Sequence, residues 1–142
     1  MATYFLIEPE VAGELGADTA IDSSVHPPRV LELHYEFKGW LGDDLLESFP
    51  CYVVTDRCKG TLEKSGFSGC TFAPVKVTAS DTFHALYPGR SLPAFHWLKV
   101  NGRAGEDDFW LSNDYRLVVS EAVLGVLRSF NIEHCGIEEF AD

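Results

Sequence analysis

The sequence lacks the features of an exported or membrane-bound protein. Its first residues, MATYFLIEPEV, contain no basic segment followed by a long apolar stretch, and no apolar run in the chain approaches the ~20 residues that span a bilayer. Only 4 cysteines occur among 142 residues, each in or beside an apolar stretch, as is typical of buried free thiols. We therefore expect a protein of a reducing compartment, the cytoplasm, that makes no contact with a membrane.

Basic residues are scarce. The chain has 11 Lys+Arg against 22 Asp+Glu, a formal net charge of -11, and the bases are concentrated in the middle of the chain. Residues 1–50 carry ten acids and two bases, residues 51–104 three acids and seven bases, and residues 105–142 nine acids and two bases. This charge opposes binding to a phosphate backbone, so no nucleic-acid ligand is expected, whereas a cationic protein would be attracted. The alternative is that the acidity serves only solubility.

Motifs for catalysis and cofactor binding are also missing. The sequence contains no G-x-S-x-G, no C-x-x-C, no H-E-x-x-H and no glycine-rich phosphate loop. Cys58 is the nearest approach to a nucleophile, because Arg57 and Lys59 flank it, but its helical spacing to Leu62 indicates a core position. The four cysteines and His134 could be counted as zinc ligands, yet their positions in apolar strands and helices favour packing. We predict no catalytic residue, no cofactor and no metal.

An internal repeat is the strongest pattern in the sequence. Residues 52–75, the first unit, recur as residues 116–140, the second unit. Five residues are identical at an offset of 65: Val53, Val54, Gly60, Leu62 and Cys70 recur as Val118, Val119, Gly125, Leu127 and Cys135. Each copy has the pattern of a hydrophobic strand, a hydroxyl N-cap (Thr55 or Ser120), an amphipathic helix and a second strand, which in the first copy covers Cys70–Thr78. We predict a strand-helix-strand unit used twice.

The rest of the chain predicts further strands and a short helix. Residues 30–37, VLELHYEF, alternate as a half-buried strand does, with the face of Glu32, His34 and Glu36 in solvent. A short helix is expected over residues 80–87, and Asn101-Gly102 signals a hairpin after a strand at residues 94–100.

Residues 9–28 show little periodicity and predict a long connection, either functional or disordered. The length and composition of the chain indicate a single globular domain over residues 1–142. Its predicted fold class is α+β, with a mixed, mostly antiparallel sheet and two short helices from the duplicated unit.

Acidic residues beside aromatic ones are the remaining candidate for a functional site. Asp43-Asp44 precedes Leu45 and is read as the cap of one helical turn, and the triplet 106–108 directly precedes Phe109-Trp110 in a predicted loop. An acidic rim beside an aromatic anchor suits the recognition of a basic protein. The predicted partner-binding residues are Asp43, Asp44, Glu106, Asp107, Asp108 and Trp110. The alternative is that Phe109 and Trp110 are core and the acids merely solvated.

These segments carry a family resemblance. The stretches DDLLESFPCYVVTDRCKGTLEKSGFSGCTFAPV, LPAFHWLKVNG and DDFWLSNDYRLVVSEAVLGVLRSFNIEHCGIEEF, within residues 41–140, resemble the small bacterial immunity proteins of polymorphic toxin systems. In many of these a late LVVSE strand-to-helix unit follows an acidic-aromatic segment. The resemblance implies a cytoplasmic antidote that binds one basic protein toxin and blocks it without turnover. No contact residue is implied by the motif itself.

Two other hypotheses stay open. The first is an enzyme with a small-molecule pocket between the two units, containing an acid or histidine with a perturbed pKa. The second is a structural module that self-associates through an exposed strand edge.

Overall fold

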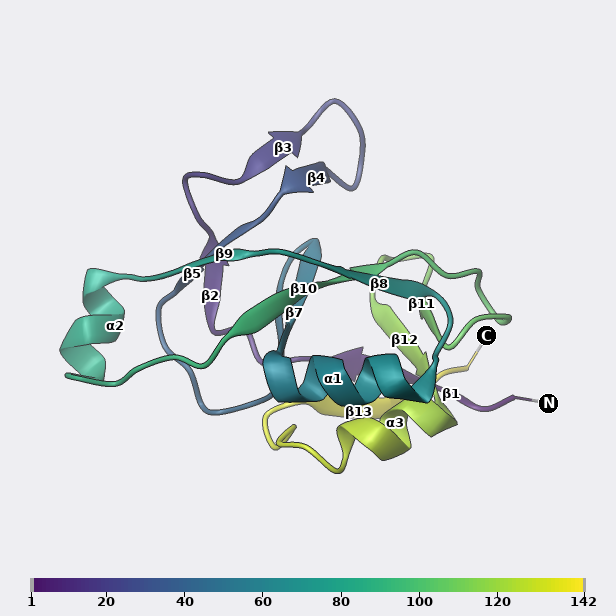
Figure 1. Ribbon diagram of the computed structural model, residues 1–142. Helices are drawn as coiled ribbons and strands as arrows, with labels where there is room; N and C mark the ends of the chain where they lie inside the picture. Colours follow the sequence, from purple (N-terminus) through teal and green to yellow (C-terminus); the bar gives the residue numbers. More distant parts are fainter. Residues whose placement is uncertain (1, 142) are drawn as a thin grey trace.

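Two four-stranded sheets form the centre of the computed structural model, which describes residues 2–141 (Figure 1). The central sheet has the order β6-β7-β10-β8, and the outer sheet has the order β11-β12-β1-β13. Every pairing within these two sheets is antiparallel. The bounds in the central sheet are β6 (Leu45–Ser48), β7 (Cys51–Thr55), β8 (Cys70–Ala73) and β10 (Phe95–Val100). Those in the outer sheet are β1 (Tyr4–Glu8), β11 (Phe109–Leu111), β12 (Leu117–Ser120) and β13 (Gly136–Glu139).

The predicted duplication is present, and in each copy a strand from elsewhere separates the two strands of the unit. In the first unit α1 (Asp56–Ser65) joins β7 to β8, and β10 lies between these strands. In the second unit α3 (Glu121–Leu127) joins β12 to β13, and β1 lies between them. The inserted strand is antiparallel to both neighbours, so the two strands of a unit run parallel without touching. The α+β class with mostly antiparallel sheets is therefore confirmed.

Equivalent side chains of the two units share one hydrophobic core. Val54, Cys58 and Leu62 of the first unit correspond to Val119, Val123 and Leu127 of the second, and all six are at most 2% exposed. Helices α1 and α3 contact each other, and both supply side chains to the space between the outer and central sheets. The helical spacing of the apolar residues in the sequence is thus explained by this shared core.

A second core covers the opposite face of the central sheet. It is closed by the third sheet, with the order β2-β5-β9, and by α2 (Asp81–Leu86), which confirms the predicted short helix. The strands of this sheet are β2 (Gly13–Leu15), β5 (His34–Phe37) and β9 (Lys76–Ala79), and β5 pairs parallel with β9. Aromatic rings fill the space, with Tyr35, Phe37 and Phe83 each at 0% exposure.

The two helix N-termini differ where the repeat predicts equivalent caps. The Ser120 side chain accepts a hydrogen bond from Val123 N at 3.2 Å, as an N-cap does. Thr55 makes no such bond, because its hydroxyl donates to the carboxylate of Asp44 instead. The prediction of a Thr55 side-chain cap is therefore wrong.

Two predicted strands are each divided into two. Residues 30–37 form β4 (Arg29–Glu32) and β5, which belong to different sheets. The expected solvent face does not exist at His34, which is 6% exposed and whose Nε2 lies 2.7 Å from Thr78 Oγ1. The predicted strand Cys70–Thr78 divides into β8 and β9, with Pro74 in the gap, because proline cannot donate to a ladder.

The prediction of a hairpin at Asn101-Gly102 is also wrong. Asn101 N donates to Gly69 O at 2.8 Å, and the chain then crosses to the outer sheet, where β11 pairs with β12. A Cβ atom on Gly102 would lie 1.9 Å from Phe109 O, so this glycine permits a close crossing of backbones.

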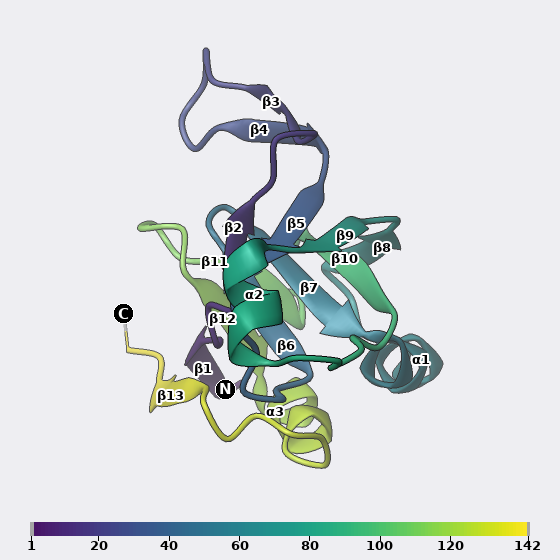
Figure 2. The ribbon, with the colours of Figure 1, turned by 90° about the vertical axis from the view of Figure 1, so that its left-hand side faces the viewer.

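Residues 9–28 contain β2 and β3 (Ala20–Asp22). Strands β3 and β4 pair to form an arm that projects from the body of the molecule (Figures 1 and 2). Ile21, Val25 and Leu31 of the arm region are 44–56% exposed. Across residues 2–141, none of the helices is both long enough and apolar enough to cross a membrane.

Candidate functional site

The face of the outer sheet that points away from the core carries a separate aromatic cluster. Strand alternation turns Phe5, Phe109 and Leu117 toward the shared core, and it turns their neighbours the other way. The outward row across the sheet runs Trp110, Val118, Leu6 and Glu138 in direct register. Tyr4 and Phe140 pack against this row. The side chains that cover this face therefore come from the sheet itself and from Phe140.

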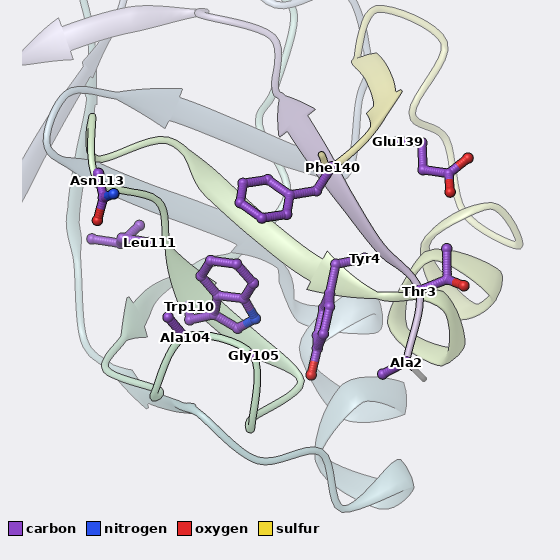
Figure 3. Close-up of a pocket in the computed structure, with 10 residues that line it drawn as sticks. All are labelled: Ala2, Thr3, Tyr4, Ala104, Gly105, Trp110, Leu111, Asn113, Glu139 and Phe140. Atoms are coloured by element: carbon purple, nitrogen blue, oxygen red, sulfur yellow. The ribbon is translucent and has the colours of Figure 1, made fainter. Parts of the chain in front are cut away.

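A pocket of about 860 Å³ opens beside this cluster (Figure 3). Its aromatic walls are Tyr4, Trp110 and Phe140, and the loop at residues 104–105 borders it. The remaining lining residues are Ala2, Thr3, Leu111, Asn113 and Glu139. Figure 3 shows the ring of Phe140 turned toward Trp110, while the Glu139 carboxylate points away from the indole. We refer to this site as the aromatic pocket.

The Trp110 ring stands nearly perpendicular to both the Tyr4 ring and the Phe140 ring. The centroids of Tyr4 and Trp110 lie 5.2 Å apart with planes at 75°, and those of Trp110 and Phe140 lie 5.0 Å apart at 85°. Edge-to-face contacts of this kind are favourable and set the rings as walls rather than as a flat stack. The pocket is thus a corner with aromatic sides.

Trp110 carries an unused hydrogen-bond donor. The residue is 4% exposed, and its Nε1 has no hydrogen-bond partner among the described residues. Figure 3 shows this nitrogen on the side of the indole that faces Tyr4. An N–H near an aromatic face is only weakly satisfied, and an oxygen acceptor would stabilise it more strongly.

The acidic triplet beside the pocket has partly structural contacts. Asp107 accepts a hydrogen bond from Arg103 N at 2.6 Å, and Asp108 accepts one from Ser68 N at 3.0 Å. Hydrogen bonding to Arg103 N lowers the pKa of Asp107. Glu106 is exposed and lies 3.6 Å from Arg103 in a surface ion pair. These carboxylates follow directly on the pocket-lining residues 104–105, and their contact with a partner stays a prediction.

Asp43 and Asp44 do not lie on a surface. Their exposed fractions are 0% and 1%, no helical turn forms at this position, and the two side chains hold the segment before β6 to the second unit. Asp44 accepts from Asn131 N at 2.7 Å and from Arg57 Nη2 at 2.6 Å, while Asp43 accepts from His134 N at 2.9 Å. We call these contacts the aspartate latch. The expectation that Asp43 and Asp44 face a partner is corrected, because buried carboxylates must be paired and here the pairs are internal.

Glu10 joins the latch at one end. Ligand atoms of Glu10, Asp43 and His134 lie within 4.8 Å of one another, close enough to hold a metal ion. The same carboxylates already accept hydrogen bonds: Glu10 from Leu41 N at 2.7 Å, and Asp43 from His134 N and from the ring. We assign this cluster a structural role.

The latch predicts a pH dependence. Hydrogen bonding between the His134 ring and Asp43 raises the pKa of His134 above 6.5, with further contributions from the charges of Asp43, Glu10 and Glu133. A raised folded-state pKa means that the ring's contribution to stability is present below 6.5 and is lost as the pH rises through the folded value. We expect the stability advantage of the wild type over His134→Gln to shrink as the pH rises above about 6.5 and through the folded-state pKa.

Urea unfolding of both proteins at several pH values measures this advantage. A difference that stays constant over the range would contradict the raised pKa. His26→Gln is a matched control, because that ring contacts Tyr115 rather than a carboxylate.

The four cysteines have no disulfide partners, and burial makes their thiols harder to ionise. All four are free, and burial raises the pKa of Cys58 to about 12 and that of Cys70 to about 11. Such thiols stay protonated near neutral pH. The packing role predicted for Cys58 agrees with its 0% exposure in the shared core.

The two units also meet at a shallow depression of about 520 Å³. Arg57 of the first unit borders it on one side, and residues 128–133 of the second unit border it on the other. Most of the interface between the units is instead filled by the shared core. The small-molecule pocket expected there is thus limited to this open surface.

Tyr4 and Phe140 are pocket residues that the sequence interpretation missed. Trp110 alone was identified, from its place after the acidic triplet. The alternation of residues 4–8 gives a signal that Tyr4 and Leu6 share a face, but nothing local shows that Trp110 lies on the same face. Pairing of β1 with β12, and of β12 with β11, brings them together.

Comparison with known proteins adds no family assignment. A scan against models of protein families gives no match, and a search of curated proteins finds no similar sequence.

Proposed function

We propose that this chain is a non-enzymatic binding protein of the immunity type, which binds a basic protein toxin and neutralises it. The observation that carries the proposal is the aromatic pocket on the outer face of the outer sheet. A recessed group of tyrosine, tryptophan and phenylalanine is the chemistry in which the energy of protein recognition concentrates. The family resemblance of residues 41–140 points to the same class of function.

Charge supports a basic partner. The chain carries a formal net charge of -11, and Glu138 stands on the outward face in register with Leu6. The triplet Glu106, Asp107 and Asp108 lies next to the pocket loop. Acidic groups around an apolar centre accelerate association with a cationic protein and discriminate against acidic ones.

The lining of the pocket favours binding over catalysis. Its side chains provide three aromatic rings, one carboxylate and no histidine, cysteine or lysine. A nucleophile paired with a base would be needed for acyl transfer, and two facing carboxylates for glycoside hydrolysis. The lining residues present neither arrangement.

Co-expression with the protein encoded beside this chain tests the proposal. We expect the neighbour to arrest growth when it is expressed alone and the chain to restore growth. We expect Glu138→Lys to weaken binding of the purified neighbour by about tenfold or more, because it reverses a charge on the pocket face.

Glu32→Lys is the matched control, since Glu32 is an exposed acid on the arm with no ion pair among the described residues. Its binding should equal that of the wild type at about 0.15 M salt, where charges far apart are screened. A neighbour that is harmless, or whose toxicity persists in the presence of the chain, would contradict the proposal.

A further inference from the structure

The walls of the aromatic pocket are suited to a particular kind of side chain. Trp110 meets both Tyr4 and Phe140 nearly at right angles, so ring faces and ring edges surround one corner. The faces of aromatic rings carry partial negative charge and attract ammonium and guanidinium groups within about 6 Å. A corner of rings therefore fits a cation better than a neutral group of the same shape.

Strand β13 brings two acidic residues, Glu138 and Glu139, to this part of the outer sheet. Glu138 is in register with Leu6 on the outward face, and Glu139 lines the pocket. Both residues are exposed, and neither forms an ion pair with another described residue. The Glu139 carboxylate points away from the indole (Figure 3), so the charge that faces an incoming cation is that of Glu138, on the same sheet face as Trp110.

The unused donor of Trp110 adds a third element. The Nε1 lies inside the pocket wall with no oxygen partner, on the side that faces Tyr4. Because this atom is itself buried beside Tyr4, a backbone carbonyl reaches it only when the Tyr4 ring turns aside, and it then supplies the oxygen acceptor that the indole lacks. An incoming chain carries such a carbonyl next to every side chain.

We propose that the aromatic pocket receives a basic side chain, lysine or arginine, with its aliphatic stem against Tyr4 and Trp110 and its charged head near the ring faces, on the sheet face that also carries Glu138. The adjoining backbone carbonyl accepts the hydrogen bond of Trp110 Nε1. That a partner protein presents this side chain rests on the proposed function, whereas the chemistry of the pocket rests on the rings, the carboxylates and the indole.

Small amides that carry single side chains test the pocket directly. The probes are the acetylated methylamides of arginine, lysine and norleucine, the last being the neutral analogue of lysine. The readout is the indole N–H resonance of the folded protein labelled with ¹⁵N. Trp110→Phe identifies the resonance of Trp110, and the indole of Trp40 is an internal control because it donates to Asp43 O at 2.9 Å.

We expect the arginine and lysine probes to shift the Trp110 resonance and to bind about tenfold more tightly than the norleucine probe. Glu138→Gln should weaken the basic probes and leave the norleucine probe unchanged. Equal binding of norleucine, or a Trp110 resonance that never moves at saturating probe, would overturn the proposal. Equal shifts of Trp40 and Trp110 would also overturn it, because they would show non-specific binding.

The probe experiment and the co-expression experiment fail separately. If the basic probes leave Trp110 unmoved while the chain still neutralises its neighbour, the assigned occupant is wrong and the proposed function stands. If the probes bind but the neighbour is not neutralised, the pocket chemistry stands and the antidote function is wrong.

Discussion

Replacing Asp44 with alanine is expected to lower the free energy of unfolding by about 3 kcal/mol. The carboxylate is 1% exposed and accepts hydrogen bonds from Thr55 Oγ1, Arg57 and Asn131 N. Alanine leaves the threonine hydroxyl and the Asn131 N–H without this acceptor, and each unsatisfied buried group costs roughly 1–3 kcal/mol. Urea unfolding followed by far-UV circular dichroism measures the loss.

Arg57→Ala distinguishes the contribution of the Arg57–Asp44 ion pair from that of the hydrogen bond between Asn131 N and Asp44. The Arg57 side chain is 65% exposed, so its loss should cost about 1 kcal/mol or less. An Arg57→Ala loss as large as that of Asp44→Ala would mean that the ion pair, and not the contact with Asn131, holds the latch. An Asp44→Ala loss below about 0.5 kcal/mol would contradict the latch itself.

Low pH should remove the stabilisation that the ionised Asp44 carboxylate provides. Burial by itself raises the pKa of Asp44, but the hydrogen bonds from Arg57, Thr55 and Asn131 N outweigh it, and the net pKa lies below 3.8. The contribution of Asp44 is therefore present above pH 3.8 and is lost as the pH falls through the lower folded-state value. The stability difference between wild type and Asp44→Asn should shrink accordingly in acid.

Leu62→Ala and Leu127→Ala should each cost about 3 kcal/mol. The two leucines occupy equivalent positions of the repeat, are 2% and 1% exposed, and belong to the same core. Each truncation loses buried apolar surface and opens a cavity that the neighbouring helix can fill only in part. Denaturant unfolding of both variants measures the losses, and Leu86→Ala, at 62% exposure, should cost less than about 0.5 kcal/mol.

The double variant tests whether the two leucines share one space. Side chains that border a common cavity are not additive, and we expect the double loss to differ from the sum of the single losses by more than about 0.5 kcal/mol. Additive losses would mean that the units pack independently and that the shared core is not cooperative.

The units were readable from the sequence because their signals are local. Val53-Val54 and Val118-Val119 mark a strand, and the spacing of Val123, Leu127 and Phe130 marks a helix. The places of β10 and β1 in the sheets could not be predicted, since which strand separates β7 from β8 depends on pairings between distant segments.

The wrong predictions for Asp43, Asp44 and the Asn101-Gly102 hairpin have a common physical cause. Asp43 and Asp44 look like surface acids in sequence, and only the fold brings Asn131 and His134 to them. Asn101-Gly102 has the local chemistry of a hairpin, but its backbone packs against Phe109 instead of reversing. In each case tertiary contacts override a local preference.

The pocket was predictable only in part. The acidic residues before Trp110 indicated it as a site residue. The alternative that Phe109 and Trp110 are core residues is also correct, because Phe109 is 1% and Trp110 4% exposed. Alternation turns Phe109 into the shared core and Trp110 onto the outward face. The sequence could not show that a buried residue would also form the wall of a pocket.

The place of β1 between β12 and β13 has a consequence for the order of events on the ribosome. Ile7 pairs with Leu117 and with Ile137, so the outer sheet closes only after nearly the whole chain has been synthesised. The central sheet needs only residues 45–100 and can form while β1 still waits for its neighbours. Pairings this distant in sequence fold slowly and leave an apolar strand open to aggregation in the meantime. Because Tyr4 and Phe140 both line the aromatic pocket, a nascent chain that stops short of residue 140 cannot complete this pocket, and translation itself limits when the pocket forms.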